Sequence, residues 1–142
     1  MTESPCEIQR KYYLPALRRI FKLTLITGIE YGYFICENPV FGRYRGIITP
    51  GEPSTVRPKP CRGRSKPIAM MHTHPGVALW VEDVELSDAD MDYIVENKLE
   101  YGGVLMATKE GYPGLHCWGP KVGECRIALK ELADIQKRYL KD

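Results

Sequence analysis

The chain has 142 residues, of which 44% are hydrophobic and 27% charged, and its formal net charge is +2 at pH 7. A chain of this size and composition can bury its own core, so we expect a single domain over residues 1–142. The charge is too small to indicate a basic surface of the kind that binds nucleic acid. We therefore expect no nucleic-acid partner, and particular sites must define the function.

Cysteine usage and hydropathy bear on the compartment. The five cysteines are odd in number, scattered and never spaced C-x-x-C, which indicates neither a disulfide framework nor a cysteine zinc site. Residues 1–13 lack the basic-then-apolar layout of a secretory signal, and no apolar run approaches the ~20 residues of a membrane-spanning helix. We expect a soluble, cytoplasmic protein in a reducing compartment, with no membrane partner.

The first half of the chain predicts a helix, a hairpin and a loop. Apolar residues between positions 6 and 21 recur at close to the helical period, with a kink or restart at Pro15. Aromatic and β-branched residues then alternate around an ENPVFG turn, which predicts a β-hairpin of Tyr31–Cys36 and Tyr44–Thr49. Glu30 precedes its first strand. Residues 50–67 predict a loop with five basic side chains: Arg57, Lys59, Arg62, Arg64 and Lys66.

The second half predicts one strand, a helix, two strands and a closing helix. Pro75 should end the first of these strands or move it to a sheet edge, because proline has no N–H to donate. Ser87 is a good N-cap for the helix. The predicted ranges are Ile68–Met71, Ser87–Lys98, Gly102–Thr108, Leu115–Trp118 and Arg126–Tyr139. This order favours an α/β fold, a single-domain α/β sandwich with a mixed central β-sheet flanked by helices.

Two of the three histidines, His72 and His74, stand one residue apart where an apolar run ends. On a strand, side chains at positions i and i+2 point to the same face, so the two imidazoles should lie side by side. Such a pair suits a divalent metal, and a catalytic zinc needs one further protein ligand beside a water. Asp90 is the best placed, since it lies in the first turn of the helix that Ser87 caps. Ordinary polar edge residues and a plain capping interaction are the alternatives.

These residues resemble the signature of a known family. The run H-T-H-P at 72–75, followed by S-D-A-D at 87–90 and preceded by Glu30, is similar to the pattern of the JAMM (MPN+) metalloprotease family. The resemblance covers the whole predicted domain. It implies an α/β sandwich of the JAMM/MPN, cytidine-deaminase-like architecture.

The resemblance also implies a role for each motif residue. His72, His74 and Asp90 would hold one zinc ion, with a water as the fourth ligand. Glu30 would be the general acid/base, and Ser87 would help to stabilise the tetrahedral intermediate.

Some assignments have alternatives within the sequence. Glu37 or Glu52 would take the place of Glu30 if another carboxylate lies at the site. The eleven-residue spacer at 76–86 is longer than in compact members of the family, so Asp83 or Asp88 is an alternative third ligand.

The activity that the resemblance implies is hydrolysis of an amide bond in a protein or peptide substrate. The usual bond of the family joins a lysine to a ubiquitin-like modifier, and the tail of a small sulfur-carrier protein is a related substrate. Two alternatives stay open: a metallohydrolase of small peptides or amides, and a catalytically silent MPN-type scaffold that only binds partners. The sequence does not indicate the oligomeric state.

Three further features have two interpretations each. Trp80, in the spacer, forms either an apolar rim for a substrate or part of the core. The basic loop from Arg57 to Lys66 either binds an acidic partner or is simply solvated, and its lack of aromatic residues argues against nucleic acid. His116 is interpreted as an ordinary strand residue, because the three metal ligands are already supplied.

Overall fold

The computed structural model describes residues 3–51 and 57–141. Its α-helices are α1 (Pro5–Tyr12), α2 (Leu14–Thr27), α3 (Asp88–Glu96) and α4 (Ala133–Tyr139). Its strands are β1 (Tyr31–Asn38), β2 (Gly42–Arg45), β3 (Thr49–Pro50), β4 (Lys66–Ala78), β5 (Tyr101–Thr108), β6 (Gly114–Gly119) and β7 (Gly123–Ala128). Two short 3-10 helices, η1 (Val81–Asp83) and η2 (Lys130–Leu132), precede α3 and α4.

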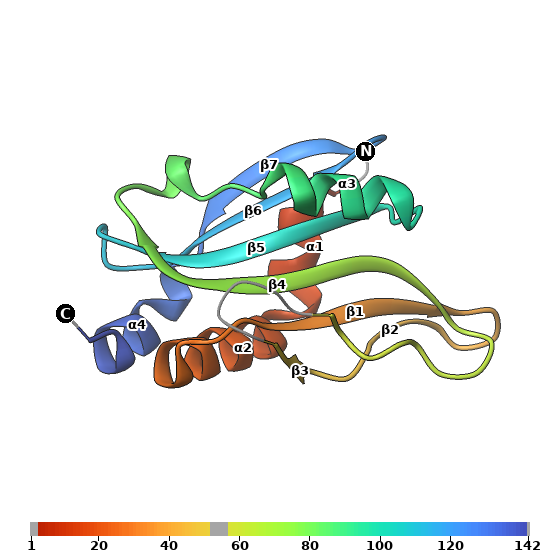
Figure 1. The fold of residues 1–142 in the computed structure, drawn as a ribbon, viewed down its shortest axis with the longest axis horizontal. Helices are drawn as coiled ribbons and strands as arrows, with labels where there is room; N and C mark the ends of the chain where they lie inside the picture. Colours follow the sequence, from red (N-terminus) through yellow and green to blue (C-terminus); the bar gives the residue numbers. More distant parts are fainter. Residues whose placement is uncertain (1–2, 52–56, 142) are drawn as a thin grey trace.

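The strands described form one sheet in the order β2-β1-β4-β5-β6-β7, and β3 pairs with β1 beside β2. The β4–β5 pair is parallel and its neighbouring pairs are antiparallel, so the sheet is mixed. In Figure 1 helix α3 lies in front of the sheet and α1 lies behind it. These features confirm an α/β fold with a mixed central sheet flanked by helices.

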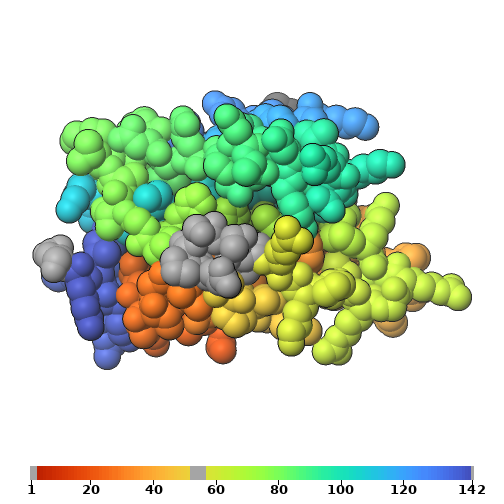
Figure 2. Space-filling view, in the orientation of Figure 1, coloured from red at the N-terminus to blue at the C-terminus, as the bar shows by residue number. Residues whose placement is uncertain are grey.

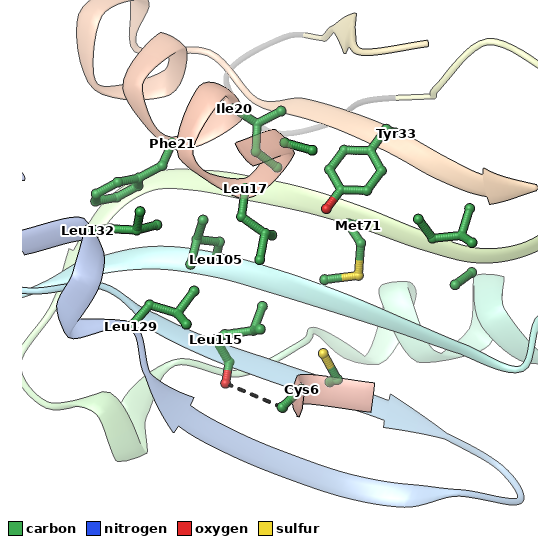
Figure 3. Packing of buried hydrophobic residues seen from close by; sticks show 14 of the residues in the cluster. Cys6, Leu17, Ile20, Phe21, Tyr33, Met71, Leu105, Leu115, Leu129 and Leu132 are labelled. Carbon is green, nitrogen blue, oxygen red and sulfur yellow. Dashed lines mark hydrogen bonds between the residues drawn. The ribbon is translucent and has the colours of Figure 1, made fainter. Parts of the chain in front are cut away.

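Each face of the sheet has its own core. The larger core lies between the sheet and helices α1, α2 and α4, where Leu17 and Phe21 of α2 point toward the strand that carries Met71 (Figure 3). Full burial of each such side chain contributes about 1.5–3 kcal/mol. The smaller core, on the other face, includes Ile94 of α3 and Leu86 from the segment before it. Helix α3 is therefore packed against the face opposite α2.

The predicted restart of the first helix at Pro15 is confirmed, and the segment forms two helices. Helix α1 ends at Tyr12, and α2 restarts at Leu14 with Pro15 in its first turn, where a missing N–H breaks no hydrogen bond. Helix α2 then runs to Thr27, beyond the predicted end at position 21. It stops at Gly28, whose φ of 77° is the left-handed conformation typical of a residue after a helix end.

Of the two predicted outcomes for Pro75, a strand end is wrong, whereas a position at a sheet edge is confirmed locally. Strand β4 has 13 residues and continues through Pro75 to Ala78. The proline is accommodated because the β4–β5 register shifts between Thr73 and Val77, where an irregularity removes the need for a proline N–H. On its other side β4 pairs with β1 only up to His72. Proline therefore lies at a bulge beside an edge, rather than at the strand end.

The predicted closing helix over Arg126–Tyr139 is also corrected. Residues 123–128 form β7, which pairs with β6 in a register that sets Cys125 opposite Cys117. The helix α4 begins only at Ala133. Apolar residues at 127 and 129 fit a strand as well as a helix, and the edge of β6 offers unpaired backbone groups that a strand can satisfy.

Cysteines are paired where the sequence indicated no disulfide framework. Cys6 of α1 is bonded to Cys125 of β7, and Cys36 of β1 is bonded to Cys61. Cys117 is a free, buried thiol. The spacing of the cysteines along the chain could not predict these pairs, because each disulfide joins segments that come together only in the folded structure. The argument from cysteine usage for a reducing compartment therefore loses its basis.

Within the described ranges, none of the helices has both the length and the apolar character needed to cross a membrane. This finding agrees with the absence of a long apolar run in the sequence.

We predict that both disulfides stabilise the fold. In the loop-closure model a bond across 25 residues, Cys36–Cys61, contributes about 3.5 kcal/mol, and one across 119 residues, Cys6–Cys125, about 5 kcal/mol. Reductant should lower the free energy of unfolding of the wild type by more than that of Cys61→Ser, measured by denaturant titration. Cys117→Ser is the control and should keep the full response. Peptide mapping that finds four free thiols at these positions in air-oxidised protein would contradict the pairing.

Candidate metal centre

Strand β4 presents both motif histidines on the α3 face of the sheet. Side chains alternate along the strand, so Met70 belongs to the α3-side core and Met71 to the α2-side core. His72 and His74 continue the first set, while Thr73 between them contacts Thr24 of α2. The Nε2 atoms of the two imidazoles lie 3.3 Å apart. The prediction that they lie side by side is confirmed.

Glu30 lies beside the histidines because β4 holds the start of β1. The Thr73 hydroxyl accepts a hydrogen bond from the Tyr31 N–H at 3.0 Å and donates to the Tyr31 carbonyl at 3.3 Å. The Glu30 carbonyl in turn accepts from the Gly51 N–H at 2.7 Å. These contacts leave the Glu30 carboxylate 3.8 Å from His74 Nε2, with the residue only 4% exposed.

Helix α3 supplies the third motif residue from its first turn. Ser87 is the N-cap: its Oγ accepts from the Asp90 N–H at 3.1 Å, and Asp90 Oδ2 accepts from the Ser87 N–H at 3.0 Å. This is a capping box, the interaction that the sequence offered as the alternative to a metal ligand. The same Oδ2 atom lies 3.4 Å from His72 Nε2 and 4.0 Å from His74 Nε2. The Asp90 carboxylate therefore caps α3 and also lies close to both histidines.

The donor atoms fit a small divalent ion. Zinc bonds of about 2.0–2.1 Å in a tetrahedron set neighbouring ligand atoms about 3.3 Å apart. The His72–His74 and His72–Asp90 separations, 3.3 and 3.4 Å, match this edge, and the His74–Asp90 separation of 4.0 Å is longer. Ligand atoms of Glu30, His72 and His74 also lie within 4.8 Å of one another. These residues are thus candidate metal-binding groups.

One detail departs from the usual environment of a metal-bound histidine. The other ring nitrogen of such a histidine commonly donates to a carboxylate or carbonyl. His72 Nδ1 is buried and has no hydrogen-bond partner among the described residues. Packing at 2% exposure, together with the contacts of Nε2, therefore sets the orientation of this ring.

The carboxylates of Glu30 and Asp90 have different pKa values because their surroundings differ. Desolvation raises the pKa of Glu30 to about 7, a rise that the charge of Asp90 supports and the charge of His72 opposes. Burial would also raise the pKa of Asp90, but the hydrogen bond and charge of His72, with the hydrogen bonds of Ser87, hold it well below its ordinary value. Desolvation and His72 lower the pKa of His74. Near neutral pH, Asp90 is thus ionised, His74 is neutral, and Glu30 can exchange a proton.

Ser87 keeps a donor for other use. Its hydroxyl oxygen accepts the Asp90 N–H, and a hydroxyl that accepts one hydrogen bond still has its own O–H to donate. Ser87 is exposed at the N-terminus of α3. The side chain therefore caps the helix and still offers a hydrogen-bond donor at the same end.

The alternative carboxylates have other surroundings. Asp83 accepts from the Trp80 N–H at 3.2 Å within the turn of η1, and Asp88 is exposed. Glu37 pairs with Arg43 at 3.1 Å at the far end of β1. Glu52 lies outside the described residues. Among the residues that are described, Glu30 and Asp90 are the carboxylates that form close pairs with His72 or His74.

The spacer folds away from β4 and returns to the sheet, as the ligand assignment requires. Its Val81 N–H donates to Glu110 at 2.8 Å, and its Val84 carbonyl accepts from Arg126 at 3.0 Å. Trp80 is 57% exposed, so its interpretation as a core residue is wrong. In Figure 2 the spacer and α3 lie along one side of the visible face and α2 along the other, with β4 between them.

His116 has a structural role that the sequence did not show. Its Nδ1 accepts from the Leu86 N–H at 2.9 Å, so its Nε2 carries the proton and faces Glu124 at 3.1 Å. Leu86 immediately precedes Ser87, and His116 thereby anchors the chain as it enters α3. The sequence gives no signal for this hydrogen bond, because Leu86 and His116 are 30 positions apart.

A second group of potential ligands lies between α1 and the β6–β7 pair. The sulfur atoms of Cys6, Cys117 and Cys125 lie within 4.8 Å of one another. Two of them are joined in a disulfide, and burial raises the pKa of the Cys117 thiol well above its ordinary value. Because thiolates are the ligands that bind metals, this oxidised cluster is a structural crosslink rather than a metal site.

Comparison with known proteins adds no family assignment. No protein-family model matches the chain, and no match was found among curated proteins or among solved structures. The geometry of the described residues therefore carries the functional argument.

We predict that Glu30 makes the stability of the metal-free protein pH-dependent. Its folded-state pKa is raised to about 7 from 4.5, so its contribution is fully present below pH 4.5 and is lost as pH rises through about 7. Relative to Glu30→Gln, the chelator-treated wild type should lose about 3 kcal/mol of unfolding free energy across this window. Denaturant titrations at several pH values measure the difference. Glu82→Gln, at an exposed site, is the control and should show the same pH dependence as the wild type. If the difference in unfolding free energy between the wild type and Glu30→Gln stays constant with pH, Glu30 does not have the raised pKa.

We also predict that His116 supports the candidate metal centre from a distance. His116→Leu leaves the Leu86 N–H without its acceptor, which should cost about 1–3 kcal/mol of unfolding free energy. The segment that enters α3 should then be held less firmly, and because α3 carries Asp90, metal binding should weaken roughly tenfold. His116→Asn offers an amide oxygen near the position of Nδ1 and should restore both properties in part. If the wild type and both variants bind the metal with equal affinity, His116 does not contribute to metal binding.

Proposed function

We propose that this protein is a zinc-dependent isopeptidase or peptidase of the JAMM (MPN+) type. The observation that carries the proposal is the convergence of His72, His74 and Asp90, with separations of 3.3 and 3.4 Å from His72 Nε2 to the other two donors. Two imidazoles and a carboxylate are a typical ligand set of catalytic zinc in hydrolases. The mixed sheet with α3 on one face and the other helices on the opposite face supports the JAMM/MPN, cytidine-deaminase-like architecture.

Two of the candidate ligands are in the state that a cation requires. His74 is neutral near pH 7 because its pKa is lowered, and Asp90 is ionised because its pKa is held low. Asp90 is oriented by the Ser87 N–H, so the capping box fixes a ligand as well as a helix. When bound, zinc would polarise the scissile carbonyl and lower the pKa of a coordinated water toward about 7.

Glu30 would then transfer a proton, and Ser87 would donate a hydrogen bond. Glu30, with a pKa of about 7, can accept a proton from the attacking water and later deliver it to the leaving amine. Its carboxylate is 3.8 Å from His74 Nε2, beside the candidate ligands rather than apart from them. The Ser87 O–H can donate to the carbonyl oxygen as negative charge develops there.

The substrate class follows from the resemblance and from the exposure of the site. His74 and Asp90 have side chains 29% and 20% exposed, whereas His72 and Glu30 are almost fully buried. A substrate can therefore reach the candidate centre at His74 and Asp90. We propose an isopeptide or peptide bond at the carboxyl end of a ubiquitin-like modifier or a small sulfur-carrier protein.

The metal test uses matched variants. The purified wild type should bind one zinc per chain by elemental analysis, and His74→Ala and Asp90→Asn should each lose it. Asp88→Asn, two residues away and exposed, should bind as the wild type does. A wild-type chain that neither contains zinc nor takes it up would leave the metal-free scaffold as the function.

The activity test separates the two hydrolase functions. Glu30→Gln should retain zinc but lose about 100-fold or more in kcat, because general acid–base catalysis typically contributes that much. Glu37→Gln is the matched control and should keep its activity. Fluorogenic amides of a ubiquitin-like carboxyl terminus and of short peptides are compared. Cleavage of the short peptides alone would favour a small-peptide metallohydrolase.

A further inference from the structure

A basic hollow lies on the side of the molecule away from the candidate metal centre. It has a volume of about 690 Å³ and is lined by α2, α4 and the end of β2. Helices α2 and α4 pack on the face of the sheet opposite α3, so the hollow is separate from His72 and His74. Its charged lining consists of five cations and one carboxylate: Arg18, Arg19, Lys22, Arg45, Arg138 and Asp134.

The one carboxylate is already neutralised. Arg18 binds Asp134 with both guanidinium nitrogens, Nη1 at 3.4 Å and Nη2 at 2.5 Å. Nearby Glu131 is bound by Arg10 at 2.7 Å. Across residues 3–51 and 57–141, the other four cations of the hollow form no ion pair. Five cations less one carboxylate leave an excess of four positive charges in a chain whose net charge is +2.

The fold holds these cations close together. Lys22 Nζ lies 5.1 Å from the centre of the Tyr139 ring, and Arg138 Cζ lies 5.3 Å from the same centre. Arg19 and Lys22, neither of which forms an ion pair with a described residue, are three residues apart on α2 and so are neighbours on the helix surface, where like charges repel. Arg45 is oriented by a hydrogen bond from its Nη1 to the Gly46 carbonyl at 3.0 Å. Such repulsion is relieved when an anion enters the hollow.

We propose that this hollow binds a compact polyanion, a ligand that carries a di- or triphosphate group. Arg19, Arg45, Arg138 and Lys22 are the cations available to it. Guanidinium forks match phosphate oxygens in paired hydrogen bonds, and three of the four free cations are arginines. The volume lies in the range of small-molecule sites. An acidic peptide would extend its charges over about 3.4 Å per residue, which fits a compact hollow less well.

The test is calorimetric titration of the full chain with inorganic tripolyphosphate, pyrophosphate and phosphate. We expect one ligand per chain, with affinity rising from phosphate to tripolyphosphate. Arg45→Gln combined with Arg138→Gln should weaken tripolyphosphate binding roughly a hundredfold, about tenfold for each charge-assisted contact. Arg57→Gln combined with Arg64→Gln makes the same change of charge on the exposed basic loop and should bind as the wild type does. Unchanged unfolding midpoints without ligand show that both double variants are folded.

Four outcomes would overturn the proposal. If tripolyphosphate does not bind, the hollow is not a polyanion site. Equal weakening in both double variants means that net charge alone attracts the anion. Binding that disappears after chelation places the phosphate at the metal centre. A glutamate oligopeptide that binds more tightly than tripolyphosphate assigns the hollow to an acidic protein segment instead.

Discussion

Strand β4 is the constraint on which the rest of the site depends. It pairs with β1 on one side and β5 on the other, so its backbone cannot rotate and its side chains must alternate between two cores. That alternation sends His72 and His74 to one face and Thr73 to the other, where its hydroxyl fixes the start of β1 and with it Glu30. A shift of register by one residue would exchange the two faces and dismantle the cluster.

Two carboxylates meet these histidines, and their environments differ. Asp90 is held ionised by His72 and by the N-cap of α3, whereas Glu30 is buried at the root of β1 with little to stabilise its charge. A carboxylate that stays charged is suited to a ligand, and one with a pKa near neutrality is suited to proton transfer. The fold thus provides both from residues of similar chemistry by controlling their access to water and hydrogen-bond donors.

Local spacing in the sequence predicted those parts of the site that depend on local geometry. The H-x-H pair and the S-x-x-D helix start could be recognised because a strand repeats every two residues and a capping box spans one helical turn. Long-range features escaped: the disulfide from Cys36 to Cys61, and the anchor from His116 to Leu86. Pro75 was misjudged for a related reason, since only the register with β5 shows the bulge that admits it.

The Cys6–Cys125 bond has a consequence for how the protein matures. It joins α1 to β7 across 119 residues, so it cannot form until the chain through β7 has been made. Helix α1 packs on β6 and β7, so its docking surface is also synthesised long after the helix itself. Until β6 and β7 have been made, α1 must wait without that surface.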